Sequence, residues 1–170
     1  MQRLTLAFDI YGTLIDTDGV VAALGDHVGD DAGTFAEIWR QKQLEYSFRR
    51  GLMQRYREFP VCTRQALDFT CERMRKNLSQ RVRDNLMARY RILPTFADVV
   101  HALQDLHRAG CRMFGFSNGL QADVENLLEH AGVRKFFHAI VSVDDVRSYK
   151  PNPDVYAHFL TSANSEAQDT

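Results

Sequence analysis

Asp9 is the first residue of this chain whose type and surroundings suit chemistry. It follows the short apolar run Leu4 to Phe8 and precedes Gly12 and Thr13 in the stretch FDIYGTLIDT. Such a run, followed by a Gly, is typical of a buried strand, so the carboxylate is expected where the strand ends. A Gly that permits a tight turn and a Thr hydroxyl that can hold the carboxylate suit a covalent nucleophile. The alternative is an Asp that only stabilises a turn or caps a helix.

Lys150 is the residue that best complements such a carboxylate. An ammonium group in a neighbouring loop keeps an Asp ionised because it offsets the cost of desolvation, although a lysine taken alone is more often a surface residue. Polar residues also follow two later apolar runs, at Ser117-Asn118 and from Asp144 to Lys150. Parallel strands of an α/β sheet present their active site at one edge, so these residues are expected to converge with Asp9.

The elements that must position these residues alternate between strands and helices. Apolar runs predict strands at Leu4 to Phe8, Cys111 to Phe116 and Ala139 to Val143, and period-3.6 patterns predict helices at 99–107 and 121–131. From about residue 20 to residue 90 the pattern is helical, with apolar faces at 35–46, 66–74 and 82–90 and breaks at Gly51 and Pro60. This order predicts an α/β fold, with a parallel sheet interrupted after its first strand by a helical block.

The length and composition are those of an ordinary globular protein. A chain of 170 residues predicts one domain with room for an inserted subdomain. Too few apolar residues precede Asp9 for a signal peptide or a membrane span, which predicts a cytoplasmic protein with no membrane partner. Three cysteines, Cys62, Cys71 and Cys111, have no CxxC spacing and are interpreted as reduced core residues.

The charge is balanced overall but unevenly distributed. The chain has 21 Lys and Arg against 22 Asp and Glu, yet residues 40–91 hold fourteen basic and five acidic residues. A basic helical layer could bind nucleic acid or attract small anions. No nucleic-acid motif accompanies the charge, so solvated helix faces are the favoured interpretation and no nucleic-acid partner is predicted.

Three motifs, FDIYGT, SNG and YKPNPDVY, resemble the first three motifs of the haloacid dehalogenase superfamily. The helical block matches the position of that superfamily's cap, and its stretches WRQKQLEY, RY and ALDFTC are similar to the L-2-haloacid dehalogenases. The resemblance extends from about Leu4 to Phe159. It implies a Rossmann-like parallel sheet core of residues 1–16 and 92–160 and an inserted helical cap of residues 17–91. Residues 161–170 are interpreted as a polar tail from their composition.

Tyr11 indicates which kind of substrate this resemblance implies. Phosphatases of the superfamily place a second Asp two residues after the nucleophile, where it acts as acid and base on the leaving oxygen. In this chain a Tyr occupies that position. A halide leaves without taking a proton, so the reaction does not need this second Asp as an acid. Carbon rather than phosphorus is therefore the expected electrophile.

The resemblance implies hydrolytic dehalogenation of short L-2-haloalkanoic acids to D-2-hydroxy acids. Asp9 would displace the halide with inversion and form an ester, and water would then attack the aspartyl carbonyl. The implied catalytic residues are Asp9, Thr13, Arg40, Ser117, Lys150 and Tyr156, and the implied substrate-binding residues are Tyr11, Leu44, Phe59 and Asn118. The 2-haloacid is the expected small-molecule partner, and the family implies a homodimer. No cofactor and no metal are expected, and the six histidines show no ligand spacing.

Matching positions in the family imply the role of each residue. Arg40 would stabilise the departing halide, a diffuse anion suited to a guanidinium, although it could also be one more solvated arginine. Ser117 and Asn118, with N–H groups at a helix start, would hold the substrate carboxylate.

The remaining residues would support the nucleophile or shape the pocket. Thr13 would orient Asp9, Lys150 would balance its charge, and Tyr156 would assist beside Lys150. An apolar pocket for the alkyl chain would be formed by Tyr11, Leu44 and Phe59, although such residues are more often part of a core.

A competing motif lies at Gly115 to Gly119. The letters GFSNG fit the G-x-S-x-G nucleophile elbow, and Asp144 and His158 follow in the right order for a triad. That fold needs more strands after the Ser than this chain supplies, and it leaves FDIYGT and WRQKQLEY unexplained. Beside the dehalogenase, two hypotheses stay open: a superfamily phosphatase, and a non-catalytic fragment or interaction protein.

The resemblance also implies core strands that the sequence does not supply. Family members continue past the third motif through two more strands, the first with a fourth motif of Ser, Asn and Asp that acts on the hydrolytic water. TSANSEAQDT, at 161–170, has no apolar strand before it and is interpreted as the frayed tail of a truncated chain. Leu4 to Phe8 is then expected to form an open edge that favours aggregation or pairing, in a marginally stable protein with impaired turnover.

Overall fold

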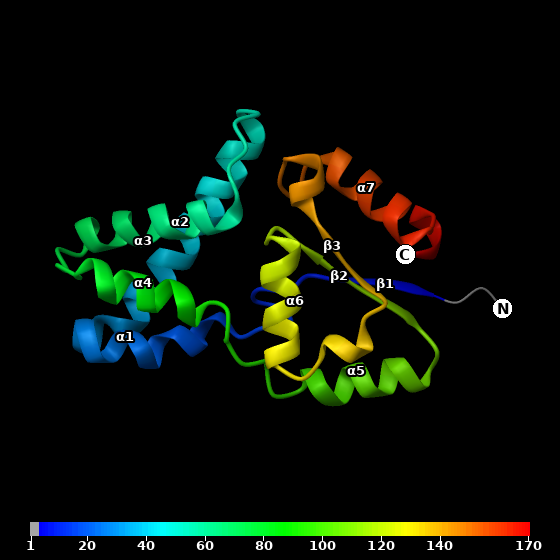
Figure 1. Ribbon diagram of the computed structural model, residues 1–170, viewed down its shortest axis with the longest axis horizontal. Coiled ribbons are helices and arrows are strands. Elements are labelled where there is room, and N and C mark those ends of the chain that lie inside the picture. Colours follow the sequence, from blue (N-terminus) through cyan, green and yellow to red (C-terminus); the bar gives the residue numbers. More distant parts are fainter. Residues whose placement is uncertain (1–3) are drawn as a thin grey trace.

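The computed structural model describes residues 4–170 of the chain (Figure 1). Its strands are β1 (Thr5–Phe8), β2 (Arg112–Ser117) and β3 (Ala139–Ser142). Its α-helices are α1 (Val21–Val28), α2 (Ala32–Leu52), α3 (Phe59–Arg73), α4 (Gln80–Arg89), α5 (Val99–Arg108), α6 (Gln121–His130) and α7 (Pro153–Ala163). The predicted order of strands and helices is confirmed.

The three strands form one parallel sheet in the order β1-β2-β3. In register, Thr5 pairs with Arg112 and Phe114 pairs with Ala139. Because all three strands are parallel, their carboxyl ends, at Phe8, Ser117 and Ser142, lie on the same side of the sheet. Within residues 4–170, β1 pairs with β2 alone and is an edge strand, as expected, and Leu4 before it is 53% exposed.

Helices cover both faces of the sheet and form a three-layer core. Met113 and Ile140 pack in one buried cluster with side chains of α5 and α6, whereas Phe114 and Phe116 pack in a second cluster with Phe159 of α7. Alternate residues of β2 therefore serve opposite layers, as the two-residue period of a strand requires. Figure 1 shows α5 and α6 on one side of the strands and α7 on the other.

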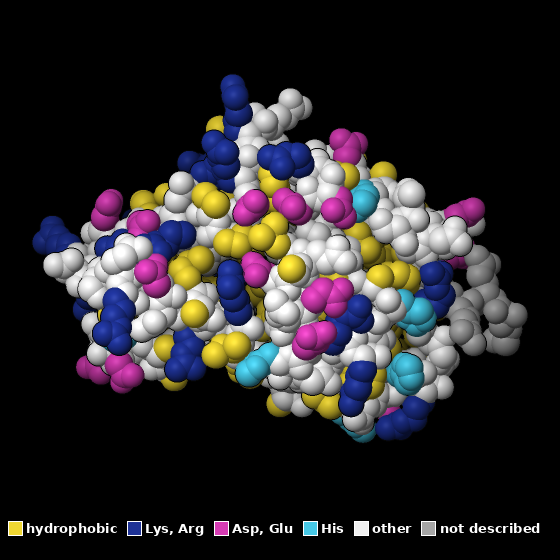
Figure 2. All heavy atoms as spheres, viewed as in Figure 1, with side chains coloured by type: hydrophobic (Ala, Val, Ile, Leu, Met, Phe, Trp, Pro, Cys, Tyr) yellow, Lys and Arg dark blue, Asp and Glu magenta, His cyan; other side chains and the backbone are white. Residues whose placement is uncertain are grey.

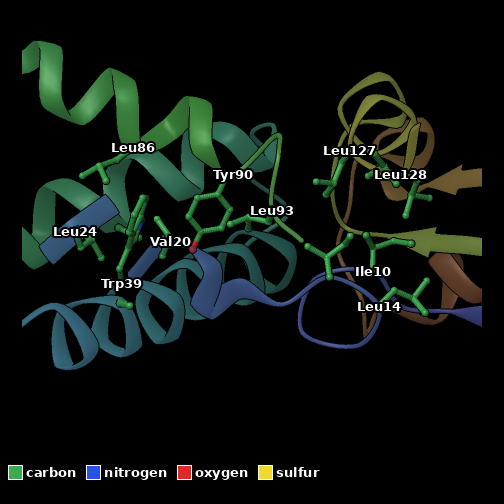
Figure 3. Close-up of a cluster of buried hydrophobic side chains, with 14 of the residues drawn as sticks. Ile10, Leu14, Val20, Leu24, Trp39, Leu86, Tyr90, Leu93, Leu127 and Leu128 are labelled. Carbon is green, nitrogen blue, oxygen red and sulfur yellow. The ribbon is translucent and has the colours of Figure 1, made fainter. Parts of the chain in front are cut away.

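The helical block of α1 to α4 lies beside the sheet, and its buried side chains form one apolar cluster with those of the sheet, α5 and α6 (Figure 3). Trp39 is fully buried there, with its ring centroid 4.8 Å from that of Tyr90, and its indole Nε1 donates to the Thr63 carbonyl at 2.8 Å. Leu24 and Leu86 close the cluster from α1 and α4. The helical pattern predicted for this segment is confirmed.

The predicted break between the helices is present, and Pro60 lies just after it. It is the second residue of α3. The first turn of a helix tolerates proline because the missing N–H has no partner within the helix there. The break is the loop from Met53 to Glu58, which begins two residues after Gly51.

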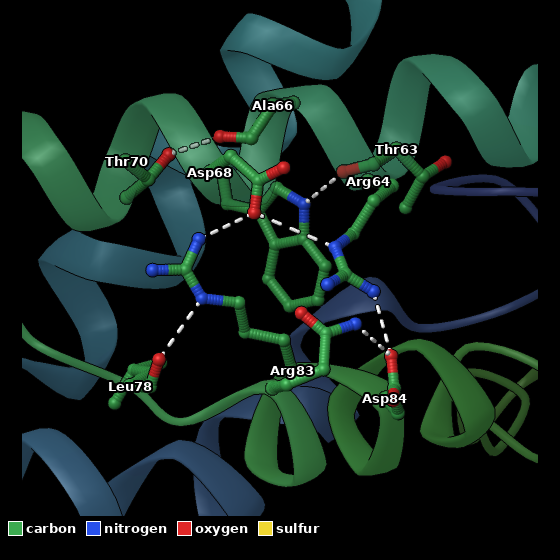
Figure 4. Close-up of polar contacts among 10 residues, drawn as sticks. Thr63, Arg64, Ala66, Asp68, Thr70, Leu78, Arg83 and Asp84 are labelled. Atoms are coloured by element: carbon green, nitrogen blue, oxygen red, sulfur yellow. Dashed lines mark hydrogen bonds and ion pairs between the residues drawn. The ribbon is translucent and has the colours of Figure 1, made fainter.

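Six of the fourteen basic residues of 40–91 form ion pairs with carboxylates: Lys42, Arg49, Arg64, Lys76, Arg83 and Arg91. Figure 4 shows Arg64 between Asp68 and Asp84, with Arg83 bonded to Asp68 and to the Leu78 carbonyl. In Figure 2 dark-blue Lys and Arg side chains are interspersed with magenta Asp and Glu over these helices. This arrangement agrees with solvated, ion-paired helix faces.

The end of the chain is more ordered than a frayed tail. Helix α7 runs to Ala163, three residues into the expected tail, because Val155, Phe159 and Ala163 form one buried stripe against the sheet. Arg112 of β2 donates to the Ala163 carbonyl at 2.5 Å. Among the helices of residues 4–170, none combines the length and the hydropathy needed to cross a membrane.

Candidate active site

Asp9 follows β1 directly, and its side chain is 46% exposed at the edge of the sheet. A tight turn comes next: the Ile10 carbonyl accepts the N–H groups of Thr13, Leu14 and Ile15. Gly12 supplies the φ of +88° that the turn needs and that side-chain-bearing residues rarely adopt. The turn brings Thr13 Oγ1 to 3.4 Å from Asp9 Oδ2, a long contact for a hydrogen bond.

Lys150 reaches the carboxylate from the loop between β3 and α7. Its Nζ lies 2.6 Å from Asp9 Oδ1, donates to the Phe116 carbonyl at 2.8 Å and lies 4.8 Å from the centre of the Phe116 ring. Its backbone N–H donates to Asn118 Oδ1 at 3.0 Å. The expected convergence of three strand ends is therefore present, and Asn118 ties two of the loops together.

Arg40 extends toward Asp9 from α2 in the helical block. Its Nη2 donates to the Tyr11 carbonyl at 2.7 Å and its Nη1 donates to Gln43 Oε1 at 2.6 Å. Gln43 is itself fully buried and donates to Thr63 Oγ1 at 2.6 Å. This chain of bonds fixes the guanidinium plane over the turn that follows the nucleophile.

A cavity of about 470 Å³ lies between the strand ends and α2. Nine of the ten predicted site residues line it, and Thr13 is the exception. The lining residues comprise Asp9, Tyr11, Arg40, Leu44, Phe59, Ser117, Asn118, Lys150 and Tyr156, joined by Phe48, Leu52 and Pro151. The wall is mainly apolar, with a carboxylate and two cations among its charged groups.

Comparison with known proteins identifies the family of this chain. The family described as "Haloacid dehalogenase-like hydrolase" matches residues 6–170. This chain belongs to that family. The match covers nearly the whole sequence, including the strand ends and the helical block.

Curated relatives of this chain are named as dehalogenases. An (S)-2-haloacid dehalogenase from Pseudomonas sp. (strain YL) is 39% identical over 89% of this chain, and haloacetate dehalogenase H-2 from Moraxella sp. (strain B) is 36% identical over 89%. The chain spans 65% and 67% of the length of these two relatives.

Solved structures of dehalogenases share the fold of this chain. The L-2-haloacid dehalogenase from Xanthobacter autotrophicus has a TM-score of 0.89 and 32% identity, over 96% of this chain and 66% of that one. A second structure of that enzyme has chloropropionic acid covalently bound. The α/β fold predicted from the sequence is confirmed as that of the family.

Tyr11 forms an aromatic wall of the cavity. Its ring centre lies 5.8 Å from that of Phe59, and a Cβ built on Gly119 would be 3.2 Å from its Cε2 atom. Burial raises the pKa of Tyr11, and the charge of Asp123 adds to this. The phenol therefore stays protonated and supplies no negative charge at this position.

Ser117 and Asn118 lie at the end of β2, but part of their hydrogen-bonding capacity is already used. Ser117 Oγ accepts the Gly119 N–H at 3.0 Å, and Asn118 Oδ1 accepts the Lys150 N–H. The Ser117 hydroxyl hydrogen and the Asn118 amide group are the donors that these contacts leave for a bound anion. Leu44 is half-buried, and Tyr156 packs its ring edge against Phe116 at 5.5 Å.

The residues of the competing nucleophile elbow are used differently. Asp144 accepts from Tyr56 at 2.6 Å, and His158 lies 3.2 Å from Asp145. A Ser-His-Asp relay from Ser117 therefore has no support in these contacts. Among residues 4–170, no three His, Cys, Asp or Glu side chains are grouped so that they could hold a metal ion.

Several residues of the site were not predicted from the sequence. Gln43 orients Arg40, Phe48 and Leu52 extend the apolar wall, and Tyr149 precedes Lys150 in the same loop. Gln43 could have been found from its spacing, because it lies three residues after Arg40 on a helix and so on the same face.

Proposed function

We propose that this chain forms an ester between Asp9 and a short L-2-haloalkanoic acid, as the first half of hydrolytic dehalogenation to a D-2-hydroxy acid. The observation that carries the proposal is the Asp9–Lys150 contact of 2.6 Å in a cavity whose other wall holds Arg40. The relatives named as 2-haloacid dehalogenases, one of them with chloropropionic acid covalently bound in its structure, support the same reaction.

Asp9 is the proposed nucleophile of the first step. A carboxylate oxygen bonds to the halogen-bearing carbon, the carbon–halogen bond breaks, and the halide leaves with the bonding electrons. Lys150 holds the carboxylate in place and balances its negative charge through the contact of 2.6 Å. Thr13 limits the rotation of the same carboxylate from its other side.

Arg40 is the proposed binding group for the departing halide. Burial lowers its pKa, but a guanidinium remains charged in proteins and stays a cation here. A fixed positive charge that meets the halide as it forms stabilises the transition state more than the substrate. Ser117 and Asn118 would hold the substrate carboxylate, and Tyr11, Leu44 and Phe59 would surround the alkyl chain.

Hydrolysis of the ester is the second proposed step. Water attacks the aspartyl carbonyl carbon and the bond from that carbon to the alkyl oxygen breaks. One proton of the water passes to the alkyl oxygen, so that the 2-hydroxy acid leaves, and the other is released to solvent as the Asp9 carboxylate is restored. Of the described residues that line the cavity, Asp9 is the only carboxylate, so the lining offers no second carboxylate as base. We therefore expect hydrolysis to be slower than ester formation in this chain.

The division of the chain into cap and core, and its oligomeric state, belong to the same proposal. We take residues 17–91 as a cap over a core of residues 1–16 and 92–160, with Tyr156 assisting Lys150. We also propose a homodimer, for which the exposed apolar side chains of Phe48, Leu52 and Met53 near the end of α2 are candidates for contact. The cytoplasmic location stays a prediction from the sequence.

The intact mass of the purified protein tests the reaction. Incubation with L-2-chloropropionate is expected to add the mass of the substrate less chloride, and peptide mapping is expected to place it on Asp9. The D enantiomer and the Asp9→Asn variant are the controls and are expected to give no adduct. Absence of an adduct and of released chloride would refute the proposal, and magnesium-dependent phosphate release would favour the phosphatase instead.

A further inference from the structure

Tyr149 belongs to the loop before α7, yet its side chain is enclosed by the helical block. It is 1% exposed. Its ring centre lies 5.1 Å from that of Tyr56 and 6.3 Å from that of Phe59. A Cβ built on Gly51 would be 3.5 Å from the Tyr149 Cβ, which shows how closely the α2 backbone passes. The tyrosine is thus inserted between the end of α2 and the start of α3.

The hydroxyl of Tyr149 is bonded inside the same block. It donates to the Arg57 carbonyl at 2.5 Å and lies 3.4 Å from Cys62 Sγ. Burial raises the pKa of Tyr149, so the group stays protonated and remains a donor. Removing this hydroxyl would leave the Arg57 carbonyl without that donor. The contact between the Tyr149 loop and the helical block would then lose more free energy than the loss of a solvent-exposed hydrogen bond would cause.

The next residue in the chain points the other way. Lys150 contacts Asp9, the Phe116 carbonyl and the Asn118 side chain, all at the sheet edge. Two adjacent side chains of one loop therefore fix the helical block and the nucleophile respectively. A second contact crosses the same boundary nearby, where Tyr56 Oη lies 2.6 Å from Asp144 Oδ1.

We propose that Tyr149 is a positioning residue for the reaction: it holds the segment from Gly51 to Cys62 against the loop that carries Lys150 and keeps the cavity closed around the substrate. This inference rests on the proposed function. It adds a role for a residue that neither contacts Asp9 nor lines the cavity.

Closure matters because the two sides of the cavity come from different parts of the fold. Arg40 and Leu44 come from α2 and Phe59 from α3, whereas Asp9 and Lys150 come from the sheet edge. A substrate that contacts both sides binds only the closed form. Its apparent affinity therefore falls in proportion to the closed fraction, while the rate within the closed complex is unchanged.

Cysteine labelling measures the opening without any substrate. Cys62 is fully buried against Tyr149, and Cys71, on the same helix, is 2% exposed within the block. Iodoacetamide labelling with peptide mapping is expected to modify Cys62 about two- to ten-fold faster in Tyr149→Phe than in the parent chain, with Cys71 unchanged. Tyr46→Phe is the matched control, because Tyr46 packs its ring against Phe69 and its hydroxyl takes no part in the hydrogen bonds that Tyr149 makes with Arg57 and Cys62. Equal acceleration at Cys62 and Cys71, or no acceleration, would overturn the proposal.

Ester formation supplies the second readout. Tyr149→Ala also removes the ring, and we expect the half-saturating concentration of L-2-chloropropionate to rise about ten-fold or more, with the maximal rate within about three-fold of the parent. A fall in the maximal rate at unchanged half-saturation would overturn the proposal, since it would place Tyr149 in the chemistry of Lys150. If the parent chain forms no ester, the proposed function fails, and the labelling of Cys62 against Cys71 still decides whether Tyr149 holds the boundary.

Discussion

Lys150 Nζ lies 2.6 Å from Asp9 Oδ1, although 141 positions separate the two residues in the sequence. Phe116, at the end of the central strand, lies beneath the ammonium group and accepts from it through its carbonyl. The parallel sheet makes this contact possible because it brings the ends of β1, β2 and β3 to one edge.

Loss of the lysine charge should therefore impair the nucleophile. We expect Lys150→Met to slow ester formation on Asp9 by about 10²- to 10³-fold, because a carboxylate that meets an anionic substrate loses its compensating cation. Time-resolved intact mass measures the rate. Lys135→Met removes an exposed lysine on the surface and should change nothing. Comparable rates in Lys150→Met and the parent would show that the contact is only structural.

Arg40 should matter most for the poorest leaving group. Its Nη1 and Nη2 atoms donate at the same time to Gln43 and to the Tyr11 carbonyl, and the single ammonium group of a lysine cannot reproduce this geometry. We expect Arg40→Lys to slow ester formation about 10²-fold with the chloro acid and about ten-fold with the iodo acid, since iodide needs less stabilisation. Arg49→Lys, on the same helix but 66% exposed, is the control. An equal loss with both halides would contradict a role in halide departure.

The sequence carries enough information for the fold and the nucleophile. Short apolar runs that end in polar residues mark each strand end, and Asp9, Ser117 and Lys150 were predicted to converge on that basis. The assignment of Arg40 needed the family resemblance, because composition alone cannot separate one arginine from the other basic residues of the block.

Contacts that depend on tertiary packing could not be predicted in this way. Tyr149 is buried by Tyr56 and Cys62, which lie about ninety positions earlier, and nothing local marks it as different from an exposed tyrosine. The exact boundary at Pro60 also depends on packing, because proline is compatible with the first turn of a helix and the sequence does not show on which side of it the helix begins.

Gln43 should contribute to both stability and orientation. It is buried between Arg40 and Thr63, so Gln43→Leu removes a partner from each. We expect a loss of about 1–3 kcal/mol in the free energy of unfolding, measured by urea titration. Gln41→Leu, exposed on the same helix, should cost less than about 0.5 kcal/mol.

A double variant separates the network from simple packing. Thr63→Val removes the hydroxyl that accepts from Gln43. Because both single changes break the same bond, the double variant should lose less stability than the sum of the two, by about 0.5–2 kcal/mol. Additive losses would mean that the two side chains act independently.

Gly12 should be required for its backbone conformation rather than for space. Its φ is +88°, and a Cβ there would meet Arg40 Nη2 at 3.6 Å, an ordinary contact distance. We expect Gly12→Ala to lower the free energy of unfolding by about 1–3 kcal/mol and to slow ester formation, because the strained turn moves Asp9 and Thr13. Gly25→Ala is the matched control: Gly25 lies within α1 with nothing within 4 Å, so alanine should stabilise the chain by up to about 1 kcal/mol. Two alanine variants of equal stability would show that the turn after the nucleophile is not held in this conformation.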